Sequence, residues 1–138
     1  MIQKDFIMRM IEMIAEVIAR IIGLIKGGDP EQASLLLENA YRDFLKEDAS
    51  YFRRLSKEEL THDLLEKHNY GNGHLEILAE LFLAEGELNF AKGDVVNSLN
   101  YYEKSYLLLE FTVQNSKSFS LAKESKMIQL KEKIETIK

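Results

Sequence analysis

Three evenly spaced histidines, His62, His68 and His74, are the first candidates for chemistry in this chain. Imidazole is the commonest metal ligand among side chains. His62 and His68 fall on one predicted helix, where their separation points them in different directions, and His74 lies beyond a glycine-rich loop. The sequence also lacks the H-E-x-x-H motif that places two histidines on one helix face. We therefore predict no metal site.

Carboxylates offer a second kind of chemistry. The candidates are Glu66, Glu76, Glu80, Glu85 and Glu87. Glu76 and Glu80 share one face of a predicted helix, and di-metal helical bundles do use inward-pointing carboxylates. Those bundles pair them with Glu-x-x-His motifs, which this chain lacks. We therefore predict that Glu76 and Glu80 form part of a solvated surface.

The remaining catalytic motifs are also missing. The chain has no cysteine, so it has neither a thiolate nucleophile nor a disulfide. It contains no nucleophile elbow or phosphate loop, and the Gly71-Asn72-Gly73 turn follows no predicted strand, as a dinucleotide fingerprint would require. We predict a protein that is not an enzyme, uses no cofactor and resides in the reducing cytoplasm.

The charge distribution excludes one class of partner. The formal net charge of −5 gives no basic field for neutralising phosphates, so we predict that the protein does not bind nucleic acid. Residues 117–138 are different, because they carry six lysines against three glutamates. We interpret this segment as a solvated lysine-rich helix face.

The elements that carry these residues are all predicted to be helices. Apolar residues recur three and four positions apart, and no strand pattern of useful length occurs. Gly27-Gly28 ends the first helix, Asp29 caps the second and Pro30 suits its first position. The expected helices span residues 1–26, 30–46, 49–55, 57–68, 74–91, 95–114 and 119–138.

We predict one all-α domain over residues 1–138, a length that one hydrophobic core can serve. The loop Asn69–Gly73 is the clearest break in the pattern. It separates a first helical half, residues 1–68, from a second half, residues 74–138, whose first part, 74–114, forms a helical hairpin.

The first predicted helix is apolar over most of its circumference. Between residues 5 and 23 its charged residues and one glycine fall in a stripe roughly 80° wide; they are Asp5, Arg9, Glu12, Glu16, Arg20 and Gly23. A charge recurs at nearly every turn, and each would cost roughly 2.5–3.5 kcal/mol at the bilayer centre. We therefore predict no membrane span.

A helix with this much apolar surface must be covered on most sides. Burial within the chain, contact with a second copy and binding to a membrane surface are all open to it, and we favour a homo-oligomer, most simply a dimer. The residues expected at that interface are Phe6, Met10, Met13, Ile14, Val17 and Ile21. If burial is instead within the chain, this helix should be the central helix of the fold.

Two stretches of the chain share one spacing. Each begins with Gly-Asp, has a small residue four positions later, a large apolar residue four further on, and another small residue three beyond that. The matched pairs are Gly28-Asp29 with Gly93-Asp94, Ala33 with Ser98, Leu37 with Tyr102, and Ala40 with Ser105. Small residues on one face allow a neighbouring helix to approach closely, and the large residue fills the gap between hairpins.

The second stretch resembles the tetratricopeptide repeat, a helical hairpin of about 34 residues. The resemblance rests on Phe82 and Gly86 before the turn and on Tyr101–Lys104 after it. It implies antiparallel helical hairpins stacked in a right-handed superhelix, with a concave face that binds peptides. The opening residues, DFIMRMIE, are also similar to those of some small uncharacterised bacterial proteins.

The tyrosine pair in the second hairpin suggests where a peptide would bind. We expect Tyr102 to pack in the core and Tyr101, which faces another way, to be partly exposed. Together with Asn89, Asn97 and Asn100, Tyr101 forms our candidate partner-binding groove.

We therefore predict an interaction scaffold that binds another protein or a peptide and self-associates through its first helix. Two alternatives remain open: a helical bundle with an internal pocket for a small ligand or for catalysis, and a purely structural homo-oligomer.

Overall fold

Every regular element in the computed structural model is an α-helix, over the residues that the structure describes, 2–67, 70–114 and 120–138. This confirms the predicted all-α class. The helices are α1 (Ile2–Lys26), α2 (Pro30–Leu45), α3 (Ala49–Arg54), α4 (Lys57–Lys67), α5 (Asn72–Ala91), α6 (Val95–Gln114) and α7 (Leu121–Ile137).

The two Gly-Asp turns form as their residues require. Gly28 and Gly93 have φ angles of 85° and 86°, in the left-handed region that glycine tolerates best. The Asp29 and Asp94 carboxylates then accept hydrogen bonds from backbone N–H groups in the first turn of α2 and α6, at 3.2 and 3.1 Å. Each pair therefore ends one helix and caps the next.

Two other helix starts can be compared with the sequence pattern. Ser56 and Glu59 exchange hydrogen bonds at the start of α4 and so form a capping box, which places the helix start at the predicted residue, Lys57. The start of α5 was predicted two residues too late, because the His74 imidazole accepts a hydrogen bond from the Gly71 N–H at 3.2 Å and allows Asn72 to begin the helix. The gap between the helices predicted at 95–114 and 119–138 lies outside the described residues.

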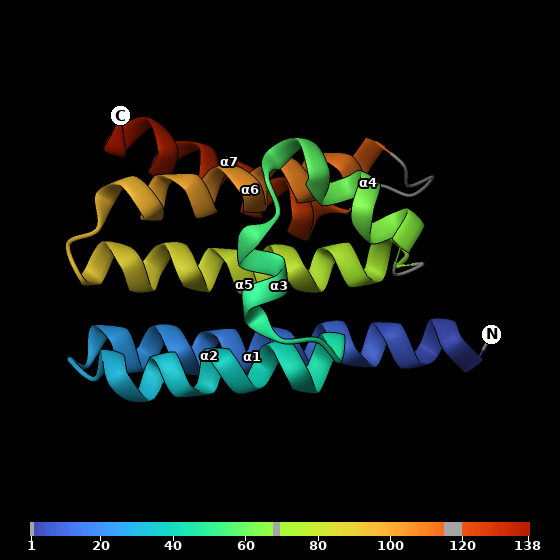
Figure 1. The fold of residues 1–138 in the computed structure, drawn as a ribbon, viewed down its shortest axis with the longest axis horizontal. Coiled ribbons are helices and arrows are strands. Elements are labelled where there is room, and N and C mark those ends of the chain that lie inside the picture. The colour runs from blue at the N-terminus through green and yellow to red at the C-terminus, as the bar shows by residue number, and fades with distance from the viewer. Residues whose placement is uncertain (1, 68–69, 115–119) are drawn as a thin grey trace.

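Helix α5 occupies the middle of the molecule (Figure 1). It packs against α1 and α2, which form one antiparallel pair, and against α6, its own antiparallel partner. Helix α7 packs on α6, while α3 and α4 cross from the α2 layer to the α6 layer. The central helix is therefore α5 rather than α1, because α5 has packed helices on both sides.

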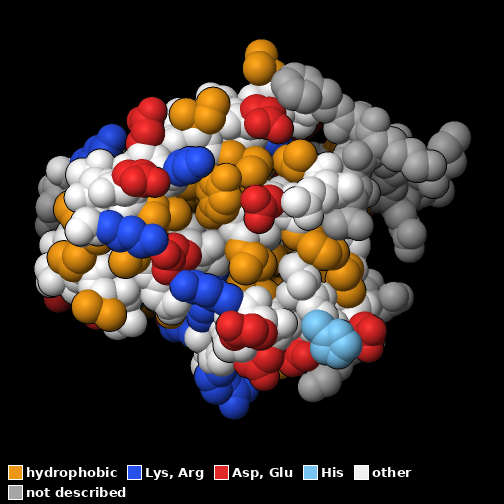
Figure 2. Space-filling model, turned by 90° about the horizontal axis from the view of Figure 1, so that it is seen from above, with side chains coloured by type: hydrophobic (Ala, Val, Ile, Leu, Met, Phe, Trp, Pro, Cys, Tyr) orange, Lys and Arg blue, Asp and Glu red, His pale blue; other side chains and the backbone are white. Residues whose placement is uncertain are grey.

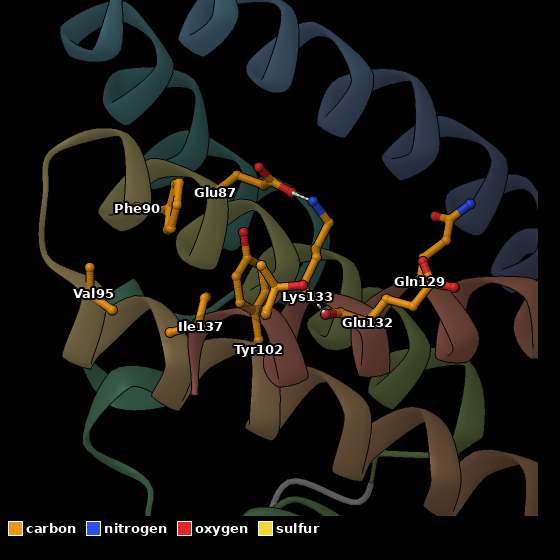
Figure 3. A pocket seen from close by; sticks show the side chains of 9 residues that line it. Glu87, Phe90, Val95, Tyr102, Gln129, Glu132, Lys133 and Ile137 are labelled. Carbon is orange, nitrogen blue, oxygen red and sulfur yellow. Dashed lines mark hydrogen bonds and ion pairs between the residues drawn. The ribbon is translucent and has the colours of Figure 1, made fainter.

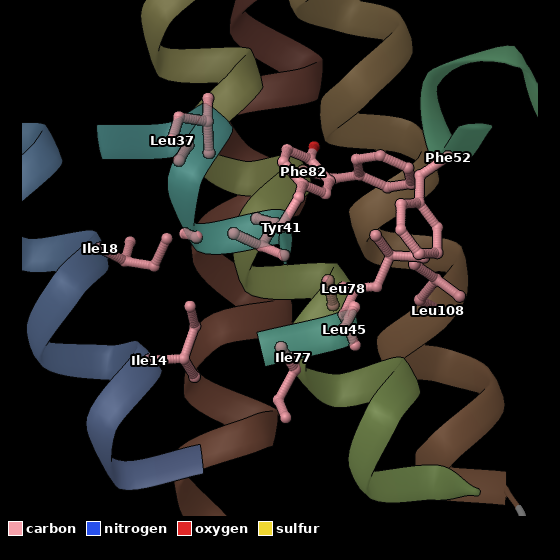
Figure 4. Packing of buried hydrophobic residues seen from close by; sticks show 14 of the residues in the cluster. Ile14, Ile18, Leu37, Tyr41, Leu45, Phe52, Ile77, Leu78, Phe82 and Leu108 are labelled. Atoms are coloured by element: carbon pink, nitrogen blue, oxygen red, sulfur yellow. The ribbon is translucent and has the colours of Figure 1, made fainter. Parts of the chain in front are cut away.

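One continuous set of buried side chains, contributed by all seven described helices, forms the core. Figure 4 shows its aromatic centre, where Tyr41, Phe52 and Phe82 lie among leucines and isoleucines from α1, α2, α5 and α6. The Tyr41 and Phe52 rings stack with centroids 5.7 Å apart. Each large side chain buried here contributes roughly 1.5–3 kcal/mol, so the short helix α3 is held mainly through Phe52.

The matched residues that follow the two Gly-Asp turns are all buried; they are Ala33, Leu37 and Ala40 on α2 and Ser98, Tyr102 and Ser105 on α6. The Ser98 and Ser105 hydroxyls donate hydrogen bonds to the carbonyls of Gly86 and Ala79 on α5, both at 2.7 Å. A β-carbon at Gly86 would lie 2.5 Å from the Tyr102 ring, so only glycine admits this contact. Small residues therefore bring α5 and α6 together, and Tyr102 packs in the core as predicted.

Candidate functional site

The four predicted partner-binding residues all lie on the α5–α6 hairpin. The Asn89 side chain donates a hydrogen bond to the Glu85 carbonyl at 2.7 Å, and the Tyr101 ring packs on Phe82 at 5.5 Å. Asn97 is exposed at the start of α6, where its amide donates to the Asp94 carboxylate at 2.6 Å.

Asn100 is half-buried one turn further along α6. Burial raises the pKa of Tyr101, and the negative charge of Glu85 acts in the same direction. The structure therefore brings Asn89 and Tyr101 towards Glu85, while Asn97 belongs to the turn.

A buried charged group, which we call the Glu85 cluster, joins α2, α3 and α5. Glu85 is almost completely buried, and its Oε2 accepts hydrogen bonds from the Tyr41 hydroxyl at 3.0 Å and from Arg53 Nε at 2.5 Å. A terminal nitrogen of Arg53 lies 2.6 Å from the Glu38 carboxylate at the edge of the cluster. Arg53 therefore bridges a buried and a half-exposed carboxylate.

The electrostatics of the Glu85 cluster follow from its burial. Removal from water raises the pKa of Glu85, while the positive charge of Arg53 acts in the opposite direction. Burial also holds the pKa of Tyr41 well above its usual range, and the nearby Glu85 carboxylate adds to the effect. With Oε2 already engaged by two donors, the cluster is suited to fixing α3 in place.

Sequence reasoning gave Glu85 no role, although a signal was present. Glu85 is three residues from both Phe82 and Leu88, so it lies on a face of α5 that is otherwise apolar. Lys104 occupies a similar position on α6, where its ammonium group lies 5.9 and 5.6 Å from the centres of the Phe82 and Tyr101 rings. Burial lowers the pKa of Lys104. A charge on an apolar face marks both positions.

Three ion pairs connect α5 with the lysine-rich helix α7. Lys123 Nζ lies 3.3 Å from Glu76, Lys126 pairs with Glu80, and Lys133 Nζ lies 2.8 Å from Glu87. The prediction that Glu76 and Glu80 are solvated is wrong, because α7 covers both carboxylates. The same pairs show that one side of the lysine-rich helix faces the protein.

A groove of about 750 Å³ opens where the ends of α5 and α7 meet the start of α6 (Figure 3). We call it the Tyr102 groove, because the nearly fully buried Tyr102 lies at its base. Its apolar lining is Phe90, Val95, Tyr102 and Ile137. Its polar lining is Glu87, Gln129, Glu132, Lys133 and Thr136. Sequence reasoning did not find this groove, because its lining comes from three helices.

The opposite side of α7 carries apolar side chains interspersed with charged ones. Figure 2 shows the face of the molecule where α7 and α4 lie, which is at the top of Figure 1. Hydrophobic side chains, drawn in orange, lie between acidic and basic ones on this face. Ile128 is exposed on α7, and Tyr106, Leu107 and Ile134 line a shallower groove between α6 and α7. Charges lie close to each of these apolar side chains.

The six predicted interface residues of α1 divide into three groups. Phe6 and Met13 are 59% and 52% exposed, and Met10 and Val17 are half-buried. Ile14 and Ile21 are completely buried against the rest of their own chain, so they cannot also face a second copy. Ile14 and Ile21 are therefore no longer candidates for the oligomer interface, because the buried stripe of α1 runs through Ile14, Ile18 and Ile21.

Metal-binding groups show no convergence in the described part of the chain, where no three histidine, aspartate or glutamate side chains are placed to hold an ion. His62 lies on the exposed surface of α4, 3.7 Å from Glu66. The His74 ring stacks on Tyr70 with centroids 4.6 Å apart. His68 lies outside the described residues.

The fold and these surfaces define an all-helical protein built around a central helix, with a buried charged cluster and an open apolar groove. None of its described helices combines the length and the apolar character needed to span a bilayer. Comparisons with protein-family models, curated proteins and solved structures find no match.

Proposed function

We propose that this protein is an interaction scaffold that self-associates through α1 and presents its remaining surface to a protein partner. The observation that supports this most directly is the exposure of Phe6 and Met13, which lie seven residues apart and so share one face of α1. Large apolar side chains gathered on a surface are typical of interaction sites. Covering each of them would contribute up to roughly 1.5–3 kcal/mol.

A second copy of the chain suits this surface because its charges are self-complementary. In an antiparallel pair of α1 helices centred between Glu12 and Met13, Arg9 of each copy lies opposite Glu16 of the other. Both side chains are exposed. A two-fold axis repeats the pair, as expected of a closed dimer. The exposed apolar side chains of Phe6 and Met13, which lie beside this charged stripe, would be covered at the same time.

The packing of the hairpins supports a tetratricopeptide-like stack as the framework of the scaffold. The Ser98 and Ser105 hydroxyls bond to α5 carbonyls, and the Tyr102 ring takes up the space that Gly86 leaves. Ala33, Leu37 and Ala40 are buried at the matching positions of α2. In such a stack, hairpins contact only their neighbours and leave an extended surface for partners.

Sedimentation velocity over a range of protein concentrations tests the self-association. We expect the full-length protein to be a dimer and Met13→Glu to weaken the dimer at least about tenfold, which corresponds to 1.4 kcal/mol. The matched control is Leu121→Glu, which places the same charge on another exposed apolar residue, on α7. The control should remain dimeric.

Two results would contradict the proposal. One is a wild-type protein that stays monomeric at every concentration. The other is a dimer that Met13→Glu and Leu121→Glu weaken equally, because the contact would then not involve α1 in particular.

A further inference from the structure

The Tyr102 groove combines an apolar base with an open mouth. Phe90 and Val95 at the mouth are 53% and 43% exposed, whereas Tyr102 at the base is almost fully buried. Small-molecule sites bury most of their ligand. A groove whose walls are themselves half exposed is better suited to one anchoring side chain of a larger partner.

The charges of the lining indicate the sign of the partner. Lys133 lies 2.8 Å from Glu87 and 5.8 Å from the centre of the Tyr102 ring, so these two opposite charges neutralise each other within the wall. Glu132 is exposed on the α7 side of the groove. The lining thus holds two carboxylates and one ammonium group, in a chain of net charge −5. A cationic partner is favoured and an anionic one is disfavoured.

We propose that the Tyr102 groove binds an amphipathic, basic segment of a partner protein. A large apolar side chain of that segment would enter between Phe90, Val95 and Ile137, and a lysine or arginine beside it would pair with Glu132. This inference rests on the proposed interaction function and names the partner's chemistry. It uses a surface different from the exposed residues of α1, so each can fail separately.

Two synthetic helical peptides of about 18 residues, or five turns, serve as probes. They share one leucine face and carry either lysine or glutamate on the other. Binding to the full-length, isotope-labelled protein is followed by fluorescence anisotropy and by NMR shifts. We expect the lysine peptide to bind at least about tenfold more tightly than the glutamate peptide, with the largest shifts at Phe90, Val95 and Ile137.

Neighbouring residues provide a matched pair of variants. Val95→Glu should reduce lysine-peptide binding at least about tenfold, whereas Val96→Glu, at an 80% exposed side chain outside the lining, should leave it unchanged. Glu132→Lys should reverse the preference between the two peptides. Ile137→Glu is a second groove variant in case Val95→Glu disturbs the start of α6, and circular dichroism checks the folding of each.

Several outcomes would overturn the proposal. One is equal binding of the lysine peptide to wild type and to both groove variants, and another is NMR shifts confined to α1. A third is binding of a small aromatic probe, such as the anion 1-anilinonaphthalene-8-sulfonate, without binding of either peptide. The last result would make the groove a small-ligand site. Sedimentation of the same samples separates the two proposals, because Val95→Glu should leave the α1 dimer intact even if the groove binds nothing.

Discussion

Arg53 of α3 places its Nε 2.5 Å from the buried Oε2 of Glu85 on α5. The same oxygen accepts a hydrogen bond from Tyr41 of α2, so one carboxylate connects three helices. Helix α3 is only six residues long, and helices of that length are not stable alone in water. The segment between α2 and α4 is therefore held by this ion pair together with the burial of Phe52.

Replacing one partner of the buried pair should cost far more than replacing both. Arg53→Met leaves the Glu85 carboxylate buried without its cation, and we expect it to lower the free energy of unfolding by about 3 kcal/mol. Arg53→Met combined with Glu85→Leu should recover most of that loss, because no charge is then buried. Urea denaturation at one protein concentration measures both. A double variant less stable than Arg53→Met would contradict this expectation, because Glu85 would then stabilise the fold through Tyr41 even without its cation.

The contrast between Ser98 and Glu85 shows how far the sequence could predict this structure. The role of Ser98 follows from local spacing, because a small residue four positions after a Gly-Asp turn faces the preceding helix. Periodicity and capping are similarly local, so they predicted the helices well. Glu85 meets Tyr41 and Arg53, which are 44 and 32 residues away in the chain, and no local pattern specifies such partners.

The same reason explains the failure for the lysine-rich segment. Lys126 and Glu80 are 46 residues apart, and until the helices are packed each looks like an ordinary solvated charge. One of the predicted partner-binding residues, Asn97, also has a local role. Asn97 serves the N-terminus of its own helix, a local use of asparagine that the groove hypothesis did not weigh.

Gly86 and Gly23 give a matched test of close helix packing. Gly86→Ala would place a β-carbon 2.5 Å from the Tyr102 ring, and we expect it to lower the free energy of unfolding by about 1–3 kcal/mol. Gly23→Ala, on the exposed face of α1 with nothing within 4 Å of the new carbon, should raise it by about 0.5–1 kcal/mol. Thermal and urea unfolding distinguish them, and equal effects would refute close packing at Gly86.

Reversing charges should test the attachment of α7 to α5. Lys126→Glu places a second carboxylate beside Glu80, and we expect it to weaken the docking of α7 by about 1 kcal/mol. Amide hydrogen exchange over residues 121–137 should then be faster by about fivefold, with α5 and α6 less affected. Lys126→Glu combined with Glu80→Lys restores opposite charges and should restore protection. Unchanged exchange in the single variant would mean that apolar contacts alone hold α7.

His74 should make stability depend on pH below neutrality. Burial lowers its pKa from the usual 6.5, and its Nδ1 accepts a hydrogen bond from the Gly71 N–H only while the imidazole is neutral. Above pH 6.5 the ring is neutral in both the folded and unfolded states, so its contribution is fully present. As the pH falls below 6.5 the unfolded chain takes up a proton first, and stability is lost until the pH passes the lower pKa of the folded state.

The stability that His74 adds relative to His74→Gln should therefore shrink as the pH is lowered from 7 towards 5, a range chosen around the ordinary histidine pKa of about 6.5. Urea midpoints measured across this range give the difference curve. His62→Gln, on the exposed surface of α4, controls for the loss of a histidine as such. A difference that stays constant with pH, or that grows as the solution becomes more acidic, would show that the neutral imidazole is not the form that begins α5.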